Sequence, residues 1–180
     1  MLRREFLAAL SGIALAYTAR SFAATPPASS DQVTVMKFSD DGKPLGLVTL
    51  PKVNKDAEWK KRLSPLAYEV TRQQGTERAF SQPGYDRHEP GLYRCVCCDN
   101  ALFDSSTKYD SGTGWPSFWQ PIATENVHNY TDRMFGMTRT EVRCALCDAH
   151  LGHVFDDGPR PTGLRYCMNT VALRFLPRAK

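Results

Sequence analysis

Residues 95–98 read Cys-Val-Cys-Cys and residues 144–147 read Cys-Ala-Leu-Cys, so the chain carries two C-x-x-C pairs. Each pair places two thiols on one tight turn, and four thiolates complete the tetrahedral shell that zinc prefers. Two disulfides are the alternative interpretation, because an oxidising compartment would permit them. We favour one structural Zn²⁺ per chain, since matched C-x-x-C pairs are a specific signal. Its ligands would be Cys95, Cys98, Cys144 and Cys147.

Short β-rich runs separated by turn sequences surround these pairs, from Leu92 onward. Gly, Pro and Asp mark the turns at 110–114, 156–159 and 161–163, where these residues relieve the backbone restrictions on a tight turn. The longest strand candidate runs from Leu164 to Leu176. The pattern predicts one mainly β domain, whose early and late segments the zinc site would tie together.

Two short helices are expected at the N-terminal end of this domain. Residues 56–63 could form the first. The second is expected over residues 65–74, because Ser64 is a suitable N-cap and Pro65 suits the first helical position. Gly75 is a suitable stop for that helix.

The first 24 residues have the pattern of an export signal. Arg3 and Arg4 precede an apolar run over 7–17, and small residues at 21–24 would suit a signal peptidase. The string Arg-Arg-Glu-Phe-Leu resembles a twin-arginine signal, which exports folded proteins. An ordinary Sec signal or an uncleaved anchor are the alternatives. We expect a periplasmic protein, exported by the twin-arginine route and not stably attached to the membrane after signal cleavage.

Residues 25–54 are expected to form a linker followed by an N-terminal hairpin extension. Residues 25–30 have a linker composition, and two apolar-rich runs over 33–51 flank a turn at Asp41-Gly42. The main domain would then span residues 55–180.

Composition excludes some classes of function. The 180 residues are 42% hydrophobic and 23% charged, as in soluble globular proteins. The formal net charge is only +4, and no dense basic stripe with interleaved aromatic residues suggests nucleic-acid binding. No apolar run has the length of about 18 residues that a membrane-spanning helix needs.

Cys167 has the sequence context of a reactive thiol. On a strand, Arg165, Cys167 and Asn169 would share one face, because side chains alternate. The guanidinium would stabilise a thiolate and lower the pKa of the thiol, and Asn169 could hydrogen-bond a substrate oxygen. A buried structural cysteine is the alternative interpretation, but the polar face favours a nucleophile.

Two histidines and a tryptophan are candidate partners of this thiol. His150 and His153 stand three residues apart, and beside a reactive thiol they would be candidate acids. Metal ligation or a surface position are the alternatives. Trp115 directly follows the turn at 112–114. Its indole could line a pocket and hold a methyl group on sulfur.

Several strings, taken together and in order, resemble the B-type methionine sulfoxide reductases, also called peptide-methionine (R)-S-oxide reductases. The resemblance covers about residues 60 to 176. The strings are Tyr68-Glu-Val-Thr-Arg72, Gly75-Thr-Glu77, Gly91-Leu-Tyr-Arg-Cys95, Asp110-Ser-Gly-Thr-Gly-Trp-Pro-Ser-Phe118, His150-Leu-Gly-His-Val-Phe-Asp-Asp-Gly158 and Pro161-Thr-Gly-Leu-Arg-Tyr-Cys-Met-Asn169.

The resemblance implies two antiparallel sheets, held by the four-cysteine zinc site, with a catalytic domain over 55–180. It also implies reduction of methionine-(R)-sulfoxide in peptides and proteins through a cysteine sulfenic acid, here on oxidised exported proteins. Cys167 would be the nucleophile. Trp115, His150, His153, Arg165 and Asn169 would line the pocket, with Phe155 nearby.

Regeneration of the thiol is where the chain departs from the family. Many members carry a resolving cysteine at the position of Thr113. Cys97, between two expected zinc ligands, is either a bystander or a resolving residue that would have to reach far. Direct attack by an external thiol, such as a thioredoxin-like reductant, is the simpler hypothesis.

Two other classes of function use the same residue types. A cysteine hydrolase would combine Cys167, a histidine and Asn169, and would form an acyl-enzyme. A zinc-ribbon binding module would need only the four ligands, and only for folding.

Overall fold

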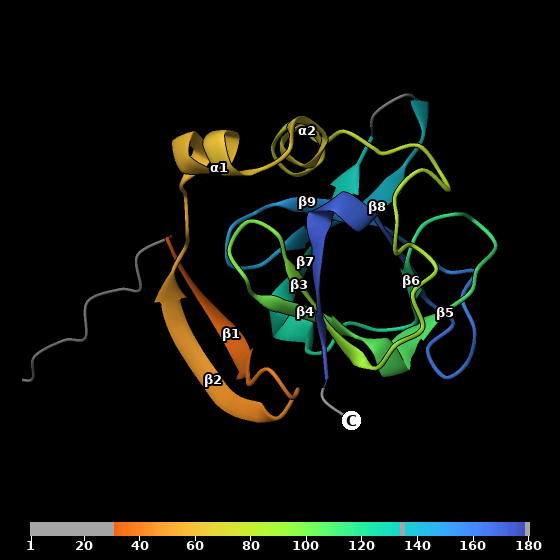
Figure 1. Cartoon of the computed structure of the whole chain (residues 1–180), viewed down its shortest axis with the longest axis horizontal. Coiled ribbons are helices and arrows are strands. Elements are labelled where there is room, and N and C mark those ends of the chain that lie inside the picture. Colours follow the sequence, from red (N-terminus) through yellow and green to blue (C-terminus); the bar gives the residue numbers. More distant parts are fainter. Residues whose placement is uncertain (1–30, 134–135, 179–180) are drawn as a thin grey trace, which may run out of the picture.

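The computed structural model describes residues 31–133 and 136–178, and the fold is mainly β (Figure 1). The predicted signal at 1–24 and linker at 25–30 lie outside the described residues. The helices are α1 (Asp56–Arg62), α2 (Pro65–Gln73) and the 3₁₀ turns η1 (Ser105–Thr107), η2 (Thr124–Asn126) and η4 (Thr170–Ala172). The strands are β1 (Gln32–Phe38), β2 (Pro44–Pro51), β3 (Gly91–Cys95), β4 (Ala101–Asp104), β5 (Lys108–Tyr109), β6 (Ser117–Phe118), β7 (Val127–Asp132), β8 (Arg139–Cys144), β9 (His150–Phe155), β10 (Arg165–Met168) and β11 (Leu173–Pro177).

The strands form three antiparallel sheets. A six-stranded sheet has the order β5-β6-β10-β9-β8-β7, and a three-stranded sheet has the order β11-β3-β4. These are the two sheets expected for the main domain. The N-terminal hairpin β1-β2 forms a third sheet beside them (Figure 1).

Aromatic rings from the two main sheets meet in the core. Phe103 of β4 stacks on Phe118 of β6, with ring centroids 4.4 Å apart, and Tyr93 of β3 lies edge-on to Phe118 at 5.0 Å. All three side chains are buried. Such aromatic pairs contribute about 0.5–1.5 kcal/mol each beyond the area that they bury.

The predicted helix over 65–74 is confirmed as α2. The Ser64 hydroxyl accepts a hydrogen bond from the Ala67 N–H, and Pro65 takes the first helical position. The helix ends one residue earlier than predicted, because Gln74, and not Gly75, adopts the left-handed conformation that closes it (φ 58°). Both helices lie on one side of the sheets (Figure 1).

The predicted hairpin over 33–51 is also present. Val33 and Val35 of β1 are buried, whereas Leu45 and Leu47 of β2 are exposed. Asn126, buried in η2, bonds both backbone groups of Met36: its Oδ1 accepts from the N–H at 2.8 Å, and its Nδ2 donates to the carbonyl at 2.9 Å. This pair of bonds attaches the hairpin to the main domain.

The single strand predicted from Leu164 to Leu176 is wrong. It is divided into β10, the turn η4 and β11, and the chain crosses from the six-stranded to the three-stranded sheet between them. The cause is distant in sequence. The carboxylate of Glu77 accepts hydrogen bonds from the N–H groups of Thr170 (2.7 Å) and Val171 (2.9 Å), which turns the backbone at this corner.

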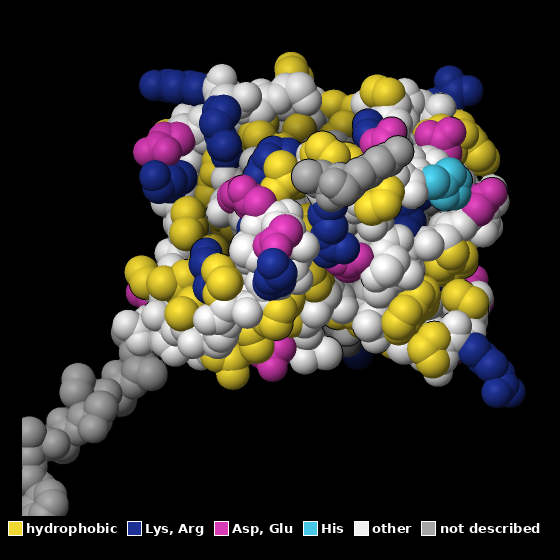
Figure 2. All heavy atoms as spheres, turned by 60° about the horizontal axis from the view of Figure 1, so that its bottom comes forward, with side chains coloured by type: hydrophobic (Ala, Val, Ile, Leu, Met, Phe, Trp, Pro, Cys, Tyr) yellow, Lys and Arg dark blue, Asp and Glu magenta, His cyan; other side chains and the backbone are white. Residues whose placement is uncertain are grey.

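The described part of the chain contains no helix long and apolar enough to cross a membrane. On the face shown in Figure 2, basic and acidic side chains are interspersed and do not gather in one patch.

We expect Gly152→Ala to destabilise the protein by about 2–3 kcal/mol, because a Cβ at this position of β9 would lie 2.1 Å from the backbone oxygen of Cys167. Urea unfolding followed by circular dichroism measures the change. Gly75→Ala is the control, since its Cβ would lie 3.0 Å from Cγ of Glu69 and 3.3 Å from the Glu69 backbone, contacts that a shift of a few tenths of an ångström relieves. Equal stability of the two variants would contradict the close approach of β9 to β10.

Candidate active site

Cys167 lies at the centre of the six-stranded sheet. Its strand, β10, pairs with β6 and β9, so that Ser117 and His153 are its ladder neighbours on the two sides. The thiol is half-buried and opens into a cavity of about 130 Å³. This volume is well below the 300–1,000 Å³ of sites for drug-sized ligands. The cavity therefore suits a single side chain.

The cavity brings together most of the residues that the sequence indicated. Its lining includes Trp115, His153, Phe155 and Asn169 with Cys167. Thr76 and Arg139 also line it and were not foreseen. Thr76 occurs in the string Gly75-Thr-Glu77, but that string does not indicate its place in the fold. The chain before β3 brings Thr76 to the cavity, and β8 brings Arg139.

His150 and Arg165 lie beside this cavity and do not line it. His150 lines an adjoining space of about 80 Å³ together with His153, and the two rings are 5.4 Å apart. Arg165 lines a cavity of about 420 Å³ that also contains Thr113. Its guanidinium lies over the Phe155 ring at 4.4 Å.

Arg165 lowers the pKa of Cys167, as predicted, but burial outweighs this contribution and the net shift is upward. Burial raises the pKa of the Cys167 thiol above its ordinary value, while Thr113 and then Arg165 lower it by a smaller amount. The guanidinium is itself paired with a carboxylate: Asp157 accepts two hydrogen bonds from it, both of 2.8 Å. A carboxylate so placed offsets part of the cation's effect on the thiol.

Each histidine is held by a carboxylate. Nδ1 of His150 lies 2.6 Å from Oε1 of the buried Glu141. Burial by itself would raise the pKa of Glu141, but its bonds with His150 and Arg143 lower that pKa to about 2. Nε2 of His150 is buried and has no hydrogen-bond partner among the described residues.

His153 has a different environment. Its Nε2 lies 3.0 Å from Oδ2 of Asp132, which also accepts a hydrogen bond of 2.7 Å from Arg139. Burial lowers the pKa of His153, and the bond with Asp132 offsets this only in part. His153 is therefore neutral at neutral pH. A neutral imidazole next to a thiol can accept its proton.

Asn169 is held by backbone groups. It follows the last residue of β10 in an extended conformation, and it lines the cavity together with Cys167. Its Oδ1 accepts from the Glu77 N–H at 3.0 Å, and its Nδ2 donates to the Leu151 carbonyl at 3.1 Å.

Glu77 is the functional residue that sequence reasoning missed. Besides its carboxylate bonds to η4, its carbonyl accepts a hydrogen bond of 3.1 Å from the Trp115 indole. Its N–H bonds Asn169. One buried residue thus positions two residues of the cavity. Glu77 occurs in the string Gly75-Thr-Glu77, but nothing in that string indicates its partners.

Hydroxyl groups surround the other side of the thiol. The Thr113 Oγ1 lies 3.9 Å from the Cys167 sulfur, and Ser111 Oγ lies 2.8 Å from the hydroxyls of both Thr113 and Ser117. Thr113, the position at which the resemblance led us to expect a resolving cysteine, is therefore next to Cys167.

Four cysteines form a second cluster, and its atoms could hold a metal ion. All four sulfurs lie within 4.8 Å of one another, with 3.6 Å between Cys95 and Cys147 and 3.5 Å between Cys98 and Cys144. A tetrahedral zinc with bonds of about 2.3 Å would separate its sulfurs by about 3.8 Å. A disulfide would need about 2.05 Å. The donor set and its spacing thus fit zinc, the first of the two interpretations.

Both halves of this cluster have the same local structure. In each, the residue after the second cysteine adopts a left-handed conformation: Asp99 has φ 66° and Asp148 has φ 54°. The N–H of each aspartate donates 2.9 Å to the carbonyl of the first cysteine, Cys95 or Cys144. The turns follow β3 and β8, so the cluster joins the two main sheets.

Cys97 is buried in the first of these turns. Its carbonyl accepts hydrogen bonds from the Trp59 indole at 2.9 Å and from Arg62 at 2.5 Å. It does not line the cavity that contains Cys167. To form a bridge with Cys167, the turn would have to leave α1.

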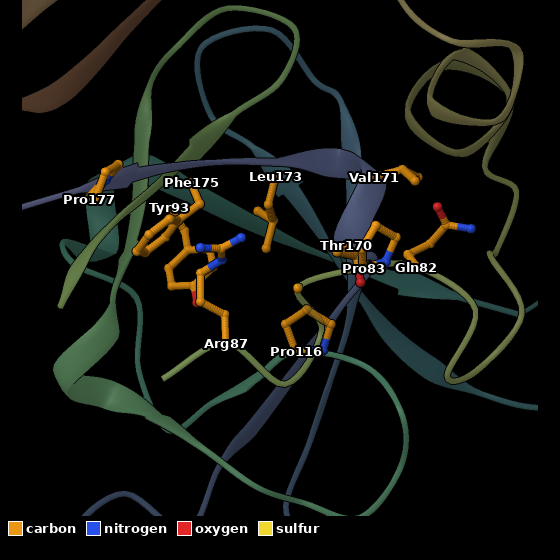
Figure 3. Close-up of a pocket in the computed structure, with 11 residues that line it drawn as sticks. Gln82, Pro83, Arg87, Tyr93, Pro116, Thr170, Val171, Leu173, Phe175 and Pro177 are labelled. Carbon is orange, nitrogen blue, oxygen red and sulfur yellow. The ribbon is translucent and has the colours of Figure 1, made fainter. Parts of the chain in front are cut away.

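A larger cavity of about 460 Å³ lies between β11, Pro116 and residues 82–87 (Figure 3). Its lining contains neither cysteine nor histidine. The smaller cavity around Cys167 is therefore the candidate site for chemistry.

Comparisons with known proteins agree on one family. The SelR domain matches residues 63–177. The chain is 63% identical over 118 residues to "Peptide methionine sulfoxide reductase B1, chloroplastic" of Arabidopsis thaliana, an alignment that covers 65% of this chain and 58% of that protein. Two bacterial proteins named "Peptide methionine sulfoxide reductase MsrB" are covered more fully. For that of Thioalkalivibrio sulfidiphilus the identity is 58%, over 67% of this chain and 88% of the relative. For that of Agrobacterium fabrum it is 53%, over 72% and 97%.

Alkylation of Cys167 by iodoacetamide should still be accelerating as the pH rises past 9.0, because burial raises the thiol pKa above that ordinary value and only the thiolate reacts. Arg165→Met should slow the reaction roughly three- to ten-fold at fixed pH, since it removes a cation that favours the thiolate. Peptide mapping by mass spectrometry gives the rate. Arg174→Met, which loses only an exposed ion pair with Asp99, should leave it unchanged. A rate that levels off below pH 7 would contradict the raised pKa.

We expect the purified protein to contain one tightly bound divalent metal ion per chain, held by the four-cysteine cluster. Cys144→Ser should lower the metal content and destabilise the fold by about 3 kcal/mol or more, because metal binding to a structural site contributes directly to folding. Elemental analysis and thermal unfolding with and without a chelator measure both effects. Cys97→Ser is the matched control and should retain the metal. A Cys98–Cys144 disulfide in metal-free protein would refute this prediction.

Proposed function

Because the chain belongs to the SelR-domain family of B-type peptide methionine sulfoxide reductases, we propose that it reduces methionine-(R)-sulfoxide in peptides and proteins, with Cys167 as the nucleophile. One observation carries the proposal. A half-buried thiol opens into a cavity that is the size of one side chain and that places an indole and a neutral imidazole beside it. Family membership also disfavours the cysteine hydrolase and the zinc-ribbon module.

The first step is attack of the Cys167 thiolate on the sulfoxide sulfur. One proton is taken up, the oxygen is transferred to Cys167 as a sulfenic acid, and the methionine thioether is released. The cysteine sulfur is oxidised by two electrons and the methionine sulfur is reduced by two. Since burial disfavours the free thiolate, a base must remove the thiol proton when substrate binds.

His153 is the better of the two histidine candidates for this proton transfer. His153 lines the cavity and is the ladder neighbour of Cys167. His150 lines only the adjoining space, on the other side of His153. In its neutral form His153 would accept the thiol proton and then deliver it to the sulfoxide oxygen. Asp132 would orient the ring during both transfers.

Trp115 would hold the methyl group of the substrate. Its indole nitrogen is fixed by the Glu77 carbonyl, so the ring has a defined orientation in the cavity. A fixed ring that contacts the methyl group would admit only one epimer with its sulfur toward Cys167. Its π-face would also favour the positive charge that develops on sulfur.

An external thiol would regenerate Cys167. Thr113 cannot form a disulfide, and Cys97 is buried in the four-cysteine cluster. The cavity of about 420 Å³ beside Thr113 and Arg165 offers an approach for a thioredoxin-like reductant. Its thiolate would attack the sulfenic sulfur, release water and leave a mixed disulfide for a second thiol to reduce.

The four cysteines would hold a structural zinc ion. Four thiolates leave no open coordination position, so the metal would join β3 to β8 and would take no part in the reaction. We further propose that the N-terminal segment exports the protein to the periplasm, where it would repair oxidised exported proteins.

Cys167→Ser should abolish turnover of a methionine-(R)-sulfoxide peptide supplied with dithiothreitol, because a serine hydroxyl cannot form the sulfenic acid. Chromatographic separation of the oxidised and reduced peptides measures the rate. Dimedone should label Cys167 in the wild-type protein only after the (R)-sulfoxide is added, and not after the (S)-epimer. Full activity of Cys167→Ser would remove this residue from the reaction.

A further inference from the structure

Phe80 is an exposed aromatic residue in a strained backbone conformation. Its side chain is 60% exposed, and its φ is +62°. A bulky residue rarely adopts this left-handed region, and such strain is concentrated at functional sites. Among the described residues, no other aromatic side chain is as exposed.

The position of the Phe80 ring is determined by the turn that precedes Trp115. The Phe80 N–H donates 2.9 Å to the Gly114 carbonyl, and the ring covers Gly114 so closely that a Cβ there would lie 2.6 Å from it. Tyr85 packs edge-on against Phe80, with ring centroids 5.6 Å apart. The contacts hold the aromatic pair against the same turn that carries Thr113 and Trp115.

Phe80 and Tyr85 line a cavity of about 320 Å³ that adjoins the Cys167 cavity. Trp115 belongs to the lining of both, so this residue connects the two cavities. The rim of the Phe80 cavity carries mixed charges, with Asp86, Asp110 and a half-buried Lys108. An open aromatic surface with a polar rim is typical of peptide binding.

We propose that Phe80 and Tyr85 form a subsite for the polypeptide that flanks the oxidised methionine, with preference for an apolar or aromatic residue. The inference rests on the proposed function and adds a determinant of substrate choice. With the sulfoxide beside Cys167, an extended chain advances about 3.3 Å per residue. A residue two positions away could therefore pass the indole and contact the Phe80 ring.

Comparing the reduction of a short substrate with that of a long one distinguishes substrate binding at Phe80 from catalysis at Cys167. N-acetyl-methionine-(R)-sulfoxide would occupy only the Cys167 cavity, whereas an octapeptide with phenylalanine two positions from the sulfoxide would also reach the subsite. Phe80→Asn is the informative variant, because asparagine tolerates a positive φ and so removes the ring without disturbing the turn. Tyr130→Asn is the matched control, since Tyr130 is 40% exposed and lines neither cavity.

We expect Phe80→Asn to lower kcat/KM for the octapeptide by about three- to ten-fold, through KM, and to leave the short substrate unchanged. Phe80→Tyr should restore the octapeptide value, and Tyr130→Asn should have no effect. Equal losses for both substrates, or no loss for either, would overturn the subsite. A wild-type protein that reduces neither substrate would instead overturn the proposed function, and the subsite with it.

Discussion

The geometry around Cys167 depends on the hydrogen bonds of the buried residue Glu77. The Glu77 carboxylate bonds the N–H groups of Thr170 and Val171, and so turns the chain from the six-stranded to the three-stranded sheet directly after β10. Hydrogen bonds to a charged group contribute about 1.5–3 kcal/mol each. The backbone of the same residue bonds Asn169 and the Trp115 indole. The side chain of Glu77 thus turns the chain where the strand of Cys167 ends, and its backbone groups hold Asn169 and Trp115 in the cavity wall.

The surroundings of Cys167 favour the protonated thiol over the free thiolate. Burial raises its pKa, and Asp157 draws the Arg165 guanidinium into a two-bond pair. A protonated thiol is the form that oxidants attack slowly. The neutral His153 beside it is suited to remove the proton once a sulfoxide fills the cavity. In the proposed mechanism this arrangement would link reactivity to substrate binding, and the proposed subsite at Phe80 and Tyr85 would add to the recognition of that substrate.

The four-cysteine cluster and the Cys167 cavity occupy different parts of the fold: the cluster lies where the two main sheets meet, and the cavity is the candidate site of chemistry. The cluster joins the turns after β3 and β8, one from each main sheet. A metal ion held there would therefore restrain the two sheets between which Phe103 and Phe118 stack. The cavity lies on β9 and β10 of the six-stranded sheet, where regular backbone pairing holds His153 opposite Cys167. A site on paired strands is positioned more accurately than one on loops.

The sequence by itself determined what depends on neighbours within a few residues. These features are the two C-x-x-C turns, the start of α2 at Ser64-Pro65, and the turn between β1 and β2. Motifs also singled out Cys167, Trp115 and His153 as candidates, and the fold brings the three to one cavity. Only the tertiary structure decided that the strand breaks after Met168, what Glu77 bonds, and that the net shift of the Cys167 pKa is upward. The physical reason is that these depend on burial and on partners far along the chain. The Glu77 carboxylate meets a backbone 93 residues away, and the loss of solvent around a thiol is a property of everything packed against it.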